Sequence, residues 1–387
     1  MSVAIIGGGA AGLFAACVLK KNGVPFTLFE RETRVGKKLL ATGNGRCNLS
    51  NMELNLSRYH GNIAFAEFAL ETFNQYNLME FLREIGILCI AEGDKIFPRS
   101  LQASSVLDML RLYIGEAQTE TEVHSIKKEK GAFLLSTSKG QKRFEKVLVC
   151  PGGKASNKLS GGGSYNLLTD LGYVCTPLAP AIVQLKCEGT KALEGIKTDA
   201  LVTVGDRKEF GEVLFTSYGL SGPPVLQVSR DAKGETLKLD IENDLSFKEI
   251  TDILTERKAL KHLTLENLFT GILNKKIGQY VLKRAGVQPL SRGVDSLTNH
   301  EIKAIASVVK GLEFRISDTN GFDNAQVTAG GIDTRDFDAH TMESKKHKGL
   351  YVAGEVLDVD GDCGGFNLQW AFSSAYVAAI SIAGGTL

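Results

Sequence analysis

Several patterns that mark well-known kinds of site are missing from this sequence. Its seven cysteines are scattered, odd in number and never spaced as Cys-x-x-Cys, which argues against a disulfide framework, a zinc site and a local redox dithiol. Its six histidines form no His-Glu-x-x-His or similar spacing, so we expect no metal site. A formal net charge of only +1 provides no basic field for nucleic acid. We therefore expect a small-molecule substrate, and no nucleic acid or membrane as partner.

Long hydrophobic runs are also missing. The longest apolar stretch, Ala371–Ala383, is interrupted by serine and tyrosine and is too short to span a bilayer. A strand-like segment begins at residue 3, which leaves no room for a secretory leader. These features predict a cytoplasmic protein. The chain has 387 residues, which is too long for one average core, so we expect two or three domains.

The periodicity of apolar residues predicts a mixed α/β start, a β-rich and then helical middle, and an α/β end. The character changes at about Ser246, where helical patterns replace strand-like ones. This order predicts one discontinuous domain that carries an insertion. The main predicted elements are strands at 3–6, 25–30, 144–150, 200–215 and 350–353, and helices at 12–21, 264–284, 299–310 and 366–383.

The segment Gly7-Gly-Gly-Ala-Ala-Gly12 contains Gly-x-Gly-x-x-Gly between a strand and a helix. Gly7 permits the tight turn, Gly9 lets the backbone approach a pyrophosphate, and Gly12 lets helix and strand pack closely. The pyrophosphate would rest on the helix N-terminus. Glu30 ends the second strand, where it can accept hydrogen bonds from an adenosine ribose. The unit therefore predicts dinucleotide binding, and the carboxylate disfavours NADP at this site.

Three further segments favour FAD over NAD. Residues 36–51 follow the ribose-binding strand, where a flavin dinucleotide would extend away from the adenosine. Lys146–Gly153 is an apolar strand that ends in a glycine pair, and glycines allow the backbone to approach a cofactor. In the first segment, phosphates are expected to contact Lys37, Lys38 and Arg46, and neutral polar contacts are expected from Asn44 and Asn48.

The third segment, residues 349–369, reads as a second junction between a strand and a helix. It begins like a calcium-binding EF-hand loop, but Cys363 stands where that loop needs glycine and Gln369 where it needs glutamate. We expect Glu355 to bind the ribityl hydroxyls. The backbone amides of Gly364-Gly365 and the following helix N-terminus are expected to face the pyrimidine edge of the flavin.

These interpretations give one set of candidate cofactor-binding residues and no candidate catalytic residue. The cofactor-binding set is Gly7, Gly9, Ala10, Ala11, Gly12, Glu30, Arg31, Lys37, Lys38, Thr42, Gly43, Asn44, Arg46, Cys47, Asn48, Val123, Pro151, Gly152, Gly153, Gly354, Glu355, Asp362, Gly364, Gly365, Asn367 and Leu368. No histidine or cysteine lies in a recognisable flavin-attachment motif, so we expect the FAD to be non-covalent.

The sequence also resembles the BaiN/YhiN-like flavoprotein family, which is usually described as NAD(P)/FAD-dependent oxidoreductases or aminoacetone-oxidase-like proteins. The resemblance spans nearly the whole chain. Besides the fingerprint, it rests on the motifs Thr42–Asn51, Phe215–Pro224, Val327–Ile332, Thr341–Lys345, Ala353–Gly361 and Gly364–Gln369.

The resemblance implies an α/β fold in which a Rossmann-type, glutathione-reductase-like FAD-binding domain is interrupted by a β-barrel-like domain and a helical domain. Matched to the composition shifts, the FAD-binding domain comprises residues 1–185 and 326–387. The barrel-like insertion comprises 186–245 and 311–325, and the helical insertion comprises 246–310.

The leading functional hypothesis is an FAD-dependent oxidoreductase that passes a hydride from NAD(P)H through flavin N5 to an unsaturated or carbonyl small molecule. The chain has neither the second dinucleotide fingerprint nor the dithiol of two-domain disulfide reductases, so the donor either visits transiently or is itself the substrate. One alternative is an amine or amino-ketone oxidase in which oxygen reoxidises the flavin. Another is a non-catalytic flavoprotein that senses redox state.

Overall fold

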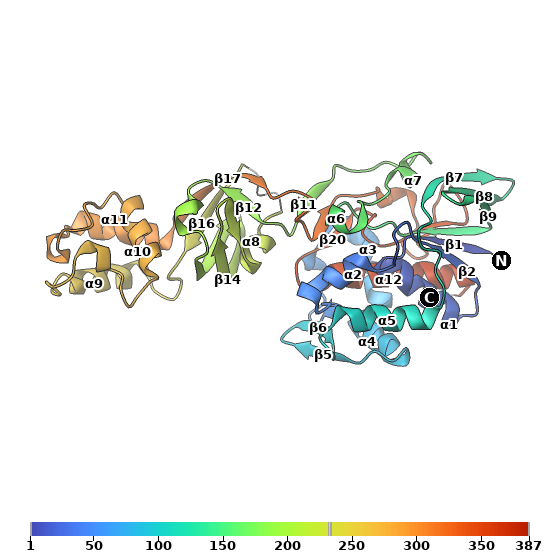
Figure 1. The fold of residues 1–387 in the computed structure, drawn as a ribbon, viewed down its shortest axis with the longest axis horizontal. Helices are drawn as coiled ribbons and strands as arrows, with labels where there is room; N and C mark the ends of the chain where they lie inside the picture. The colour runs from blue at the N-terminus through green and yellow to red at the C-terminus, as the bar shows by residue number, and fades with distance from the viewer. Residues whose placement is uncertain (1, 231, 233, 386–387) are drawn as a thin grey trace. The chain divides into compact units, whose positions relative to one another are not determined.

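A computed structural model of the chain describes residues 2–230, 232 and 234–385, which form two compact units (Figure 1). Unit 1 combines the residues up to Pro180 with those from Ala325 onward, and unit 2 is Ala181–Asn324. The boundaries drawn from the sequence, 185/186 and 325/326, fall five residues and one residue from these.

A four-stranded parallel sheet in the order β19-β10-β1-β2 lies at the centre of unit 1. Its strands are β1 (Val3–Ile6), β2 (Phe26–Phe29), β10 (Lys146–Val149) and β19 (Leu350–Val352), all short and mostly buried apolar runs. A parallel sheet is covered on both faces, which is why its strands lack polar alternation. Because the strands are parallel and in register, the loops that follow them meet at one edge of the sheet.

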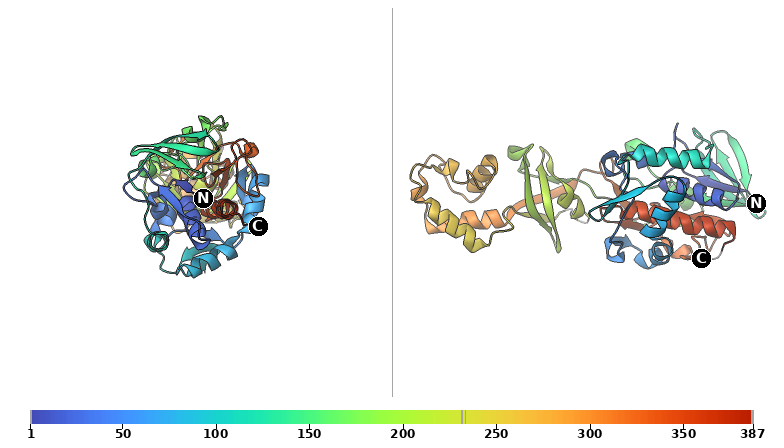
Figure 2. Two further views of the ribbon diagram at one scale, coloured as in Figure 1. Left: turned by 90° about the vertical axis from the view of Figure 1, so that its right-hand side faces the viewer. Right: turned by 90° about the horizontal axis from the view of Figure 1, so that it is seen from below.

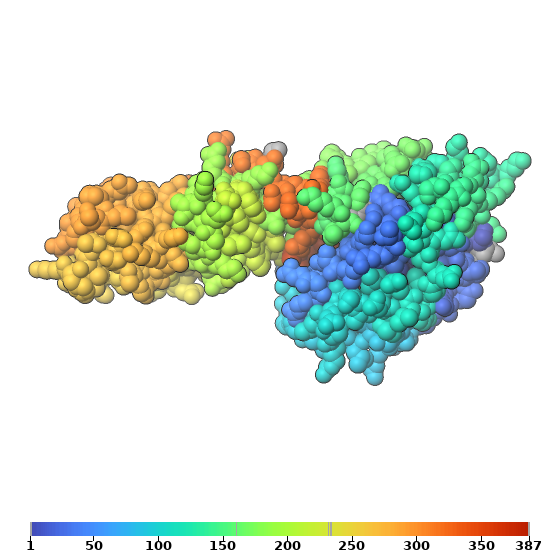
Figure 3. Space-filling view, viewed as in Figure 1, coloured from blue at the N-terminus to red at the C-terminus, as the bar shows by residue number. Residues whose placement is uncertain are grey.

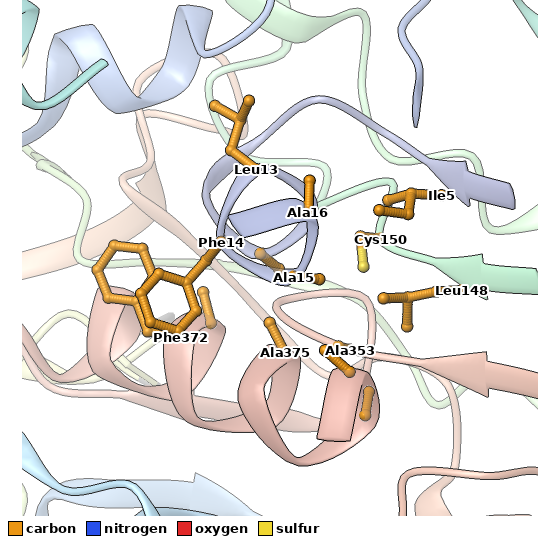
Figure 4. Packing of buried hydrophobic residues seen from close by; sticks show 14 of the residues in the cluster. Ile5, Leu13, Phe14, Ala15, Ala16, Leu148, Cys150, Ala353, Phe372 and Ala375 are labelled. Atoms are coloured by element: carbon orange, nitrogen blue, oxygen red, sulfur yellow. The ribbon is translucent and has the colours of Figure 1, made fainter. Parts of the chain in front are cut away.

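Helices from the two ends of the chain pack against each other in unit 1. Helix α1 (Ala10–Lys21) follows β1, and α12 (Phe366–Ala383) closes the chain beside it (Figure 2). Both are rich in alanine, which allows their axes to approach closely. The aromatic rings of Phe14 and Phe372 meet with centroids 5.0 Å apart (Figure 4). After the insertion, the chain therefore returns to complete the core of unit 1.

Smaller sheets and helices surround this core. The three-stranded sheet β7-β8-β9 contacts the central sheet through Phe144, whose ring meets that of Phe29 edge-on. In the space-filling view, orange-red residues of the stretch that follows the insertion reach the surface beside green residues of the loops after β10 (Figure 3). The remaining strands of unit 1 are β3 (Ser50–Asn51), β4 (Tyr59–Gly61), β5 (Cys89–Glu92), β6 (Lys95–Pro98), β7 (Val123–Glu129), β8 (Ala132–Thr137), β9 (Gly140–Phe144), β18 (Val327–Ala329) and β20 (Val359–Gly361), with β11 (Ala179–Ala181) at the boundary. Its remaining helices are α2 (Lys37–Ala41), α3 (Ile63–Thr72), α4 (Gln75–Glu84), α5 (Ala103–Ile114), α6 (Asn157–Ser160) and α7 (Asn166–Thr169).

Unit 2 contains a closed antiparallel barrel and a group of helices. Along β13, buried Ala200, Val202 and Val204 alternate with more exposed neighbours and fill the barrel interior. The barrel strands, in sheet order, are β12 (Leu185–Cys187), β15 (Gly219–Ser221), β14 (Arg207–Phe215), β13 (Lys197–Val204), β16 (Thr236–Asp240) and β17 (Leu312–Thr319). The helices are α8 (Pro223–Gln227), α9 (Phe247–Arg257), α10 (Lys275–Arg284) and α11 (Asn299–Lys310). The predicted fold class, a Rossmann-type domain interrupted by a barrel and helices, is confirmed.

One predicted helix is interrupted. The stretch 264–284 forms a short 3-10 turn at Leu265–Asn267 and then α10, which begins at Lys275. Gly271 adopts a positive φ of 84°, which ends the helical path, and the side chain of Asn274 caps the new helix by accepting the Lys276 amide. The apolar periodicity continues across this break, so the sequence pattern did not predict the interruption.

Phe14 provides a test of the unit 1 core. Its ring lies 4.8–5.4 Å from those of Phe73, Phe81 and Phe372, and it is fully buried. Replacing it with alanine should lower the free energy of unfolding by about 3–5 kcal/mol, because it leaves a cavity among three aromatic rings. Denaturant unfolding followed by circular dichroism measures this. The control Leu112→Ala, at a side chain that is 76% exposed, should stay within about 0.5 kcal/mol of the wild type. A loss below about 1 kcal/mol for Phe14→Ala would contradict this packing.

Candidate functional site

The fingerprint loop joins β1 to α1 at the carboxyl edge of the parallel sheet. A Cβ on Gly7, which has φ +104°, would lie 2.2 Å from the carbonyl oxygen of Cys150. A Cβ on Gly12 would lie 1.9 Å from the carbonyl oxygen of Gly7. A Cβ on Gly9, in contrast, would meet nothing within 4 Å. The protein's own packing thus requires Gly7 and Gly12, whereas the space beside Gly9 is open to a ligand.

The N-terminus of α1 faces this open space. Gly9 is the N-cap residue, and no side chain caps the helix. The first-turn amides of Ala10 and Ala11 lack intrahelical acceptors, as at any helix start. Such a terminus favours a phosphate group through its free N–H groups and its dipole.

Glu30 lies directly after β2 and is tied to the fingerprint. Its Oε2 accepts the Gly8 amide at 2.8 Å, and its Oε1 accepts the Glu32 amide at 2.9 Å. Each carboxylate oxygen has a second lone pair, so a ribose hydroxyl can still donate to it. Hydrogen bonds between residues 28–32 and 118–121 bring buried Val123, the first residue of β7, close behind this strand. This end of the site has the donor and acceptor set that an adenosine needs.

The three basic residues expected to bind phosphate each have a carboxylate partner. Lys38 donates to Glu355 Oε2 at 2.7 Å. Lys37 pairs with Glu32, and Arg46 pairs with Glu92 while its guanidinium lies over the ring of Phe97. Phosphate binding by these side chains stays a prediction, and it would require them to share or exchange their present partners. The N-terminus of α1, in contrast, has no carboxylate in its first turn.

Arg31, another of the cofactor-binding candidates, bonds to a backbone carbonyl and lies 3.9 Å from the Glu32 carboxylate. Its guanidinium donates to the carbonyl oxygen of Gly162 at 2.7 Å. This contact ties the loop after α6 to the end of β2, across the carboxyl edge of the sheet.

The segment 42–48 has an unusual backbone. Gly43, Asn44, Gly45 and Cys47 all have positive φ, between 54° and 83°. Non-glycine residues in this region are strained and concentrate at binding sites. The Thr42 hydroxyl donates to Leu39, which anchors the start of the loop.

Cys47 and Asn48 of this loop differ in what their side chains do. The Cys47 thiol is fully buried, and burial raises its pKa to about 12, so it stays protonated and fills space. The Asn48 Oδ1 atom is buried without a hydrogen-bond partner among the described residues. A buried polar atom of this kind normally has a partner.

Glu355 connects several loops of the site. Its Oε1 accepts the Thr328 amide at 3.0 Å, and its Oε2 accepts Lys38. A Cβ on Gly153 would lie 2.3 Å from Oε1, so the glycine pair after β10 leaves room for this carboxylate rather than only for a cofactor. Pro151 and Gly152 precede it, and Gly152 has φ +73°.

The start of α12 is held by its own side chains. The amide group of Asn367 bonds to both the N–H and the carbonyl of Gly361, at 2.8 and 2.7 Å. The Asp362 carboxylate accepts from Arg58 at 3.2 Å and lies 2.8 Å from the His60 ring nitrogen. These residues therefore shape the loop, and direct cofactor contact by their side chains stays a prediction. Leu368 packs partly buried against the core.

The glycines before α12 are required for a reason that the sequence did not reveal. A Cβ on Gly365, with φ +100°, would lie 2.3 Å from the carbonyl oxygen of Ser50. The protein's own backbone therefore excludes a side chain at this position. Gly364 has φ +137°, and Gly354 has φ +84°, where an added Cβ would lie 3.0 Å from the Cβ of Ala11 in α1. The amides of the first turn of α12 remain the donors at this end.

Four residues near these loops were not among the sequence candidates. Arg58 and His60 lie on or beside β4, which pairs with β20 about 300 positions later, and no local pattern predicts such a pairing. Thr328 lies within the Val327–Ile332 motif, which was a signal for it. Tyr165 places a buried hydroxyl beside Glu355.

Taken together, the loops after β1, β2, β10 and β19 fit a dinucleotide. They offer an open helix N-terminus and, in Glu30, a carboxylate that can accept further hydrogen bonds. Among the described residues, no three His, Cys, Asp or Glu side chains are grouped as a metal site. Within the same part of the chain, no helix is both long and apolar enough to cross a bilayer.

A family model described as the HI0933-like protein Rossmann domain matches residues 1–381. The chain belongs to this family. The resemblance inferred from the motifs is thereby confirmed, and with it an FAD-dependent oxidoreductase family. The fold and the fingerprint described above agree with that membership.

Two curated relatives match along nearly their whole length. A 3-dehydro-bile acid delta(4,6)-reductase of Clostridium scindens is 36% identical, over 97% of each chain. A ribosomal RNA dihydrouridine synthase of Haemophilus influenzae is 30% identical, over 98% of this chain and 97% of its own. Among solved structures, a 3-ketosteroid-delta4-(5alpha)-dehydrogenase of Rhodococcus jostii RHA1 covers 98% of this chain and 96% of its own at 12% identity, with a TM-score of 0.49.

The contrast between Gly9 and Gly12 gives a test of the site. Gly9→Ala should leave the melting temperature of the FAD-free protein unchanged, because a Cβ there meets nothing, yet it should weaken FAD binding at least tenfold, about 1.4 kcal/mol. Gly12→Ala should instead lower the melting temperature without any ligand, because its Cβ collides with a backbone carbonyl. Differential scanning fluorimetry and FAD titration measure both. Unchanged FAD affinity in Gly9→Ala would show that the pyrophosphate lies elsewhere.

Proposed function

We propose that this protein uses FAD to reduce a carbon–carbon double bond conjugated to a carbonyl group in a small molecule, with NAD(P)H as the electron donor. The observation that carries the proposal is the full-length similarity to a delta(4,6)-reductase of a 3-dehydro-bile acid. A 3-keto group next to such double bonds forms an unsaturated ketone. Uridine, whose reduction gives dihydrouridine, likewise has a double bond conjugated to a carbonyl. The relatives thus share one kind of acceptor although their substrates differ in size.

The chain's own groups support this chemistry. Bound FAD would supply the hydride transfer at its N5 atom. The first-turn amides of α12 and the helix dipole would stabilise negative charge at the pyrimidine edge of the ring. Arg58 and His60 hold the carboxylate of Asp362, which limits the negative charge that it presents near that edge. In the proposed reaction the β-carbon of the acceptor gains the hydride and the α-carbon gains a proton.

The sequence contains no separate binding domain for an electron donor, so the donor either visits the flavin transiently, as we propose for NAD(P)H, or is itself the substrate. The sequence has no second dinucleotide fingerprint and no Cys-x-x-Cys dithiol. A donor without its own binding domain must reach the flavin transiently, and a nicotinamide nucleotide can do so. The competing hypothesis is that an amine substrate reduces the flavin directly.

A second candidate is a uridine base in RNA as the acceptor, and the distribution of charge favours it. Residues 246–310 contain eleven Lys and Arg and six Asp and Glu, which gives this segment a net charge of +5. The whole chain has 45 Lys and Arg and 44 Asp and Glu, so the remaining residues carry a net charge of −4. The whole-chain charge of +1 conceals this difference. A locally basic domain attracts phosphate backbones. The expectation of no nucleic-acid partner rested on the whole-chain value alone.

Anaerobic mixing tests the proposal. NADH or NADPH should bleach the flavin, and a steroid 4-en-3-one should then restore its colour with one equivalent of acceptor per flavin. Bleaching by a simple amine, with recovery only in oxygen, would contradict the reductase and favour the oxidase. Absence of bleaching by any donor would favour a non-catalytic flavoprotein.

Unmodified ribosomal RNA is the second acceptor in the same experiment. If RNA rather than the enone restores the colour, the second candidate replaces the first. The double variant Lys261→Glu/Lys276→Glu, at two exposed side chains of the helical insertion, serves as the matched control. It should leave recovery by the enone unchanged and should slow recovery only if RNA is the acceptor.

A further inference from the structure

Lys95 is an exposed lysine of β6 that has no carboxylate partner among the described residues. Glu92 lies directly opposite it on β5, but the Glu92 carboxylate is paired with Arg46. The guanidinium of Arg46 also lies over the ring of Phe97, 4.5 Å from its centroid. Because Glu92 is occupied in this way, the charge of Lys95 is available to a group outside the protein.

The pairing of β3 with β6 places Lys95 beside the loop that precedes α12. Lys95 lies opposite Asn51, and opposite residues project from the same face of a sheet with their Cβ atoms about 5 Å apart. The side chain of Asn51 donates to the carbonyl oxygen of Gly364 at 3.0 Å. Lys95 therefore starts one side chain away from the Gly364 loop, and its flexible stem lets the ammonium group extend toward it.

The positive charge of Lys95 acts on this loop. Burial raises the pKa of the Cys363 thiol, and the charge of Lys95 partly offsets that rise. The carboxylate of Asp362 has the opposite effect on the thiol, but it is bound by Arg58 and by the ring of His60. Lys95 thus contributes a positive field at the N-terminus of α12.

The pyrimidine edge of FAD is expected at this same terminus. Hydride transfer to flavin N5 delivers two electrons and one proton, so the reduced ring carries one negative charge, around N1 and the C2 carbonyl. A nearby positive charge stabilises this form relative to the oxidised ring, which is neutral. We propose that Lys95 supplies a positive charge to the pyrimidine edge of the flavin and thereby raises the reduction potential of the bound FAD.

This inference rests on the proposed FAD-dependent function, because it requires the flavin ring to lie at the start of α12. Lys127 provides a matched control. It is another exposed lysine of unit 1, on β7, whose first residue Val123 lies behind the adenosine end of the site. Replacing either lysine with methionine removes one positive charge, so a difference between the two variants reports the position of the charge.

The test compares Lys95→Met with Lys127→Met in the full-length protein with FAD bound. The midpoint potential of the flavin is measured by slow enzymatic reduction in the presence of a reference dye. Lys95→Met should lower the equilibrium constant for two-electron reduction about three- to tenfold, which corresponds to about 15–30 mV. Lys127→Met and the charge-conserving Lys95→Arg should keep the wild-type potential. The affinity of Lys95→Met for oxidised FAD should be unchanged, because the oxidised ring is neutral.

Other outcomes overturn the inference. An unchanged potential in Lys95→Met would mean that its charge does not reach the flavin ring. An equal fall in both methionine variants would reflect the total charge of the protein and not the position of Lys95. Weaker binding of oxidised FAD with an unchanged potential would place Lys95 on the phosphates instead of the ring. If the wild-type protein fails to bind FAD, the proposed function fails and not this assignment alone.

Discussion

The carboxylate of Glu355 is the point at which the separate pieces of the site are joined. It accepts from Lys38 near the start of the chain and from Thr328 near its end, and it packs on Gly153. These three partners belong to segments that are far apart in sequence. Because both carboxylate oxygens are used within the protein, the loops are held in place before any ligand arrives. This preorganisation lowers the entropy that binding must offset.

The discontinuous fold follows from the same arrangement. The barrel and helices of unit 2 are inserted into a chain whose last helix must return beside α1 to complete the core of unit 1. Unit 1 cannot form its binding edge from the N-terminal part alone, since β19, Glu355 and the start of α12 all follow the insertion. The insertion can therefore vary in surface charge without changing how the cofactor edge is assembled.

Much of unit 1 could be predicted because its signals are local. Short apolar runs mark β1, β10 and β19, and the fingerprint marks the tight turn between β1 and α1. The partners of Lys37, Lys38 and Arg46 could not be predicted, since each ion pair depends on how distant loops pack. The same holds for Gly365, whose neighbour Ser50 is on another strand. The pairing of β4 with β20 is a contact of this kind and has no signature in either segment.

The central claim is that FAD lies along the edge where these loops meet. Hydrogen–deuterium exchange of the protein with and without FAD tests it most directly. FAD should slow amide exchange in peptides covering residues 7–14, 42–49, 152–165 and 363–369, while the barrel strands β13 and β16 exchange as before. Protection that leaves residues 7–14 and 363–369 unchanged would contradict the account, because neither the pyrophosphate nor the flavin would then be at its proposed helix terminus.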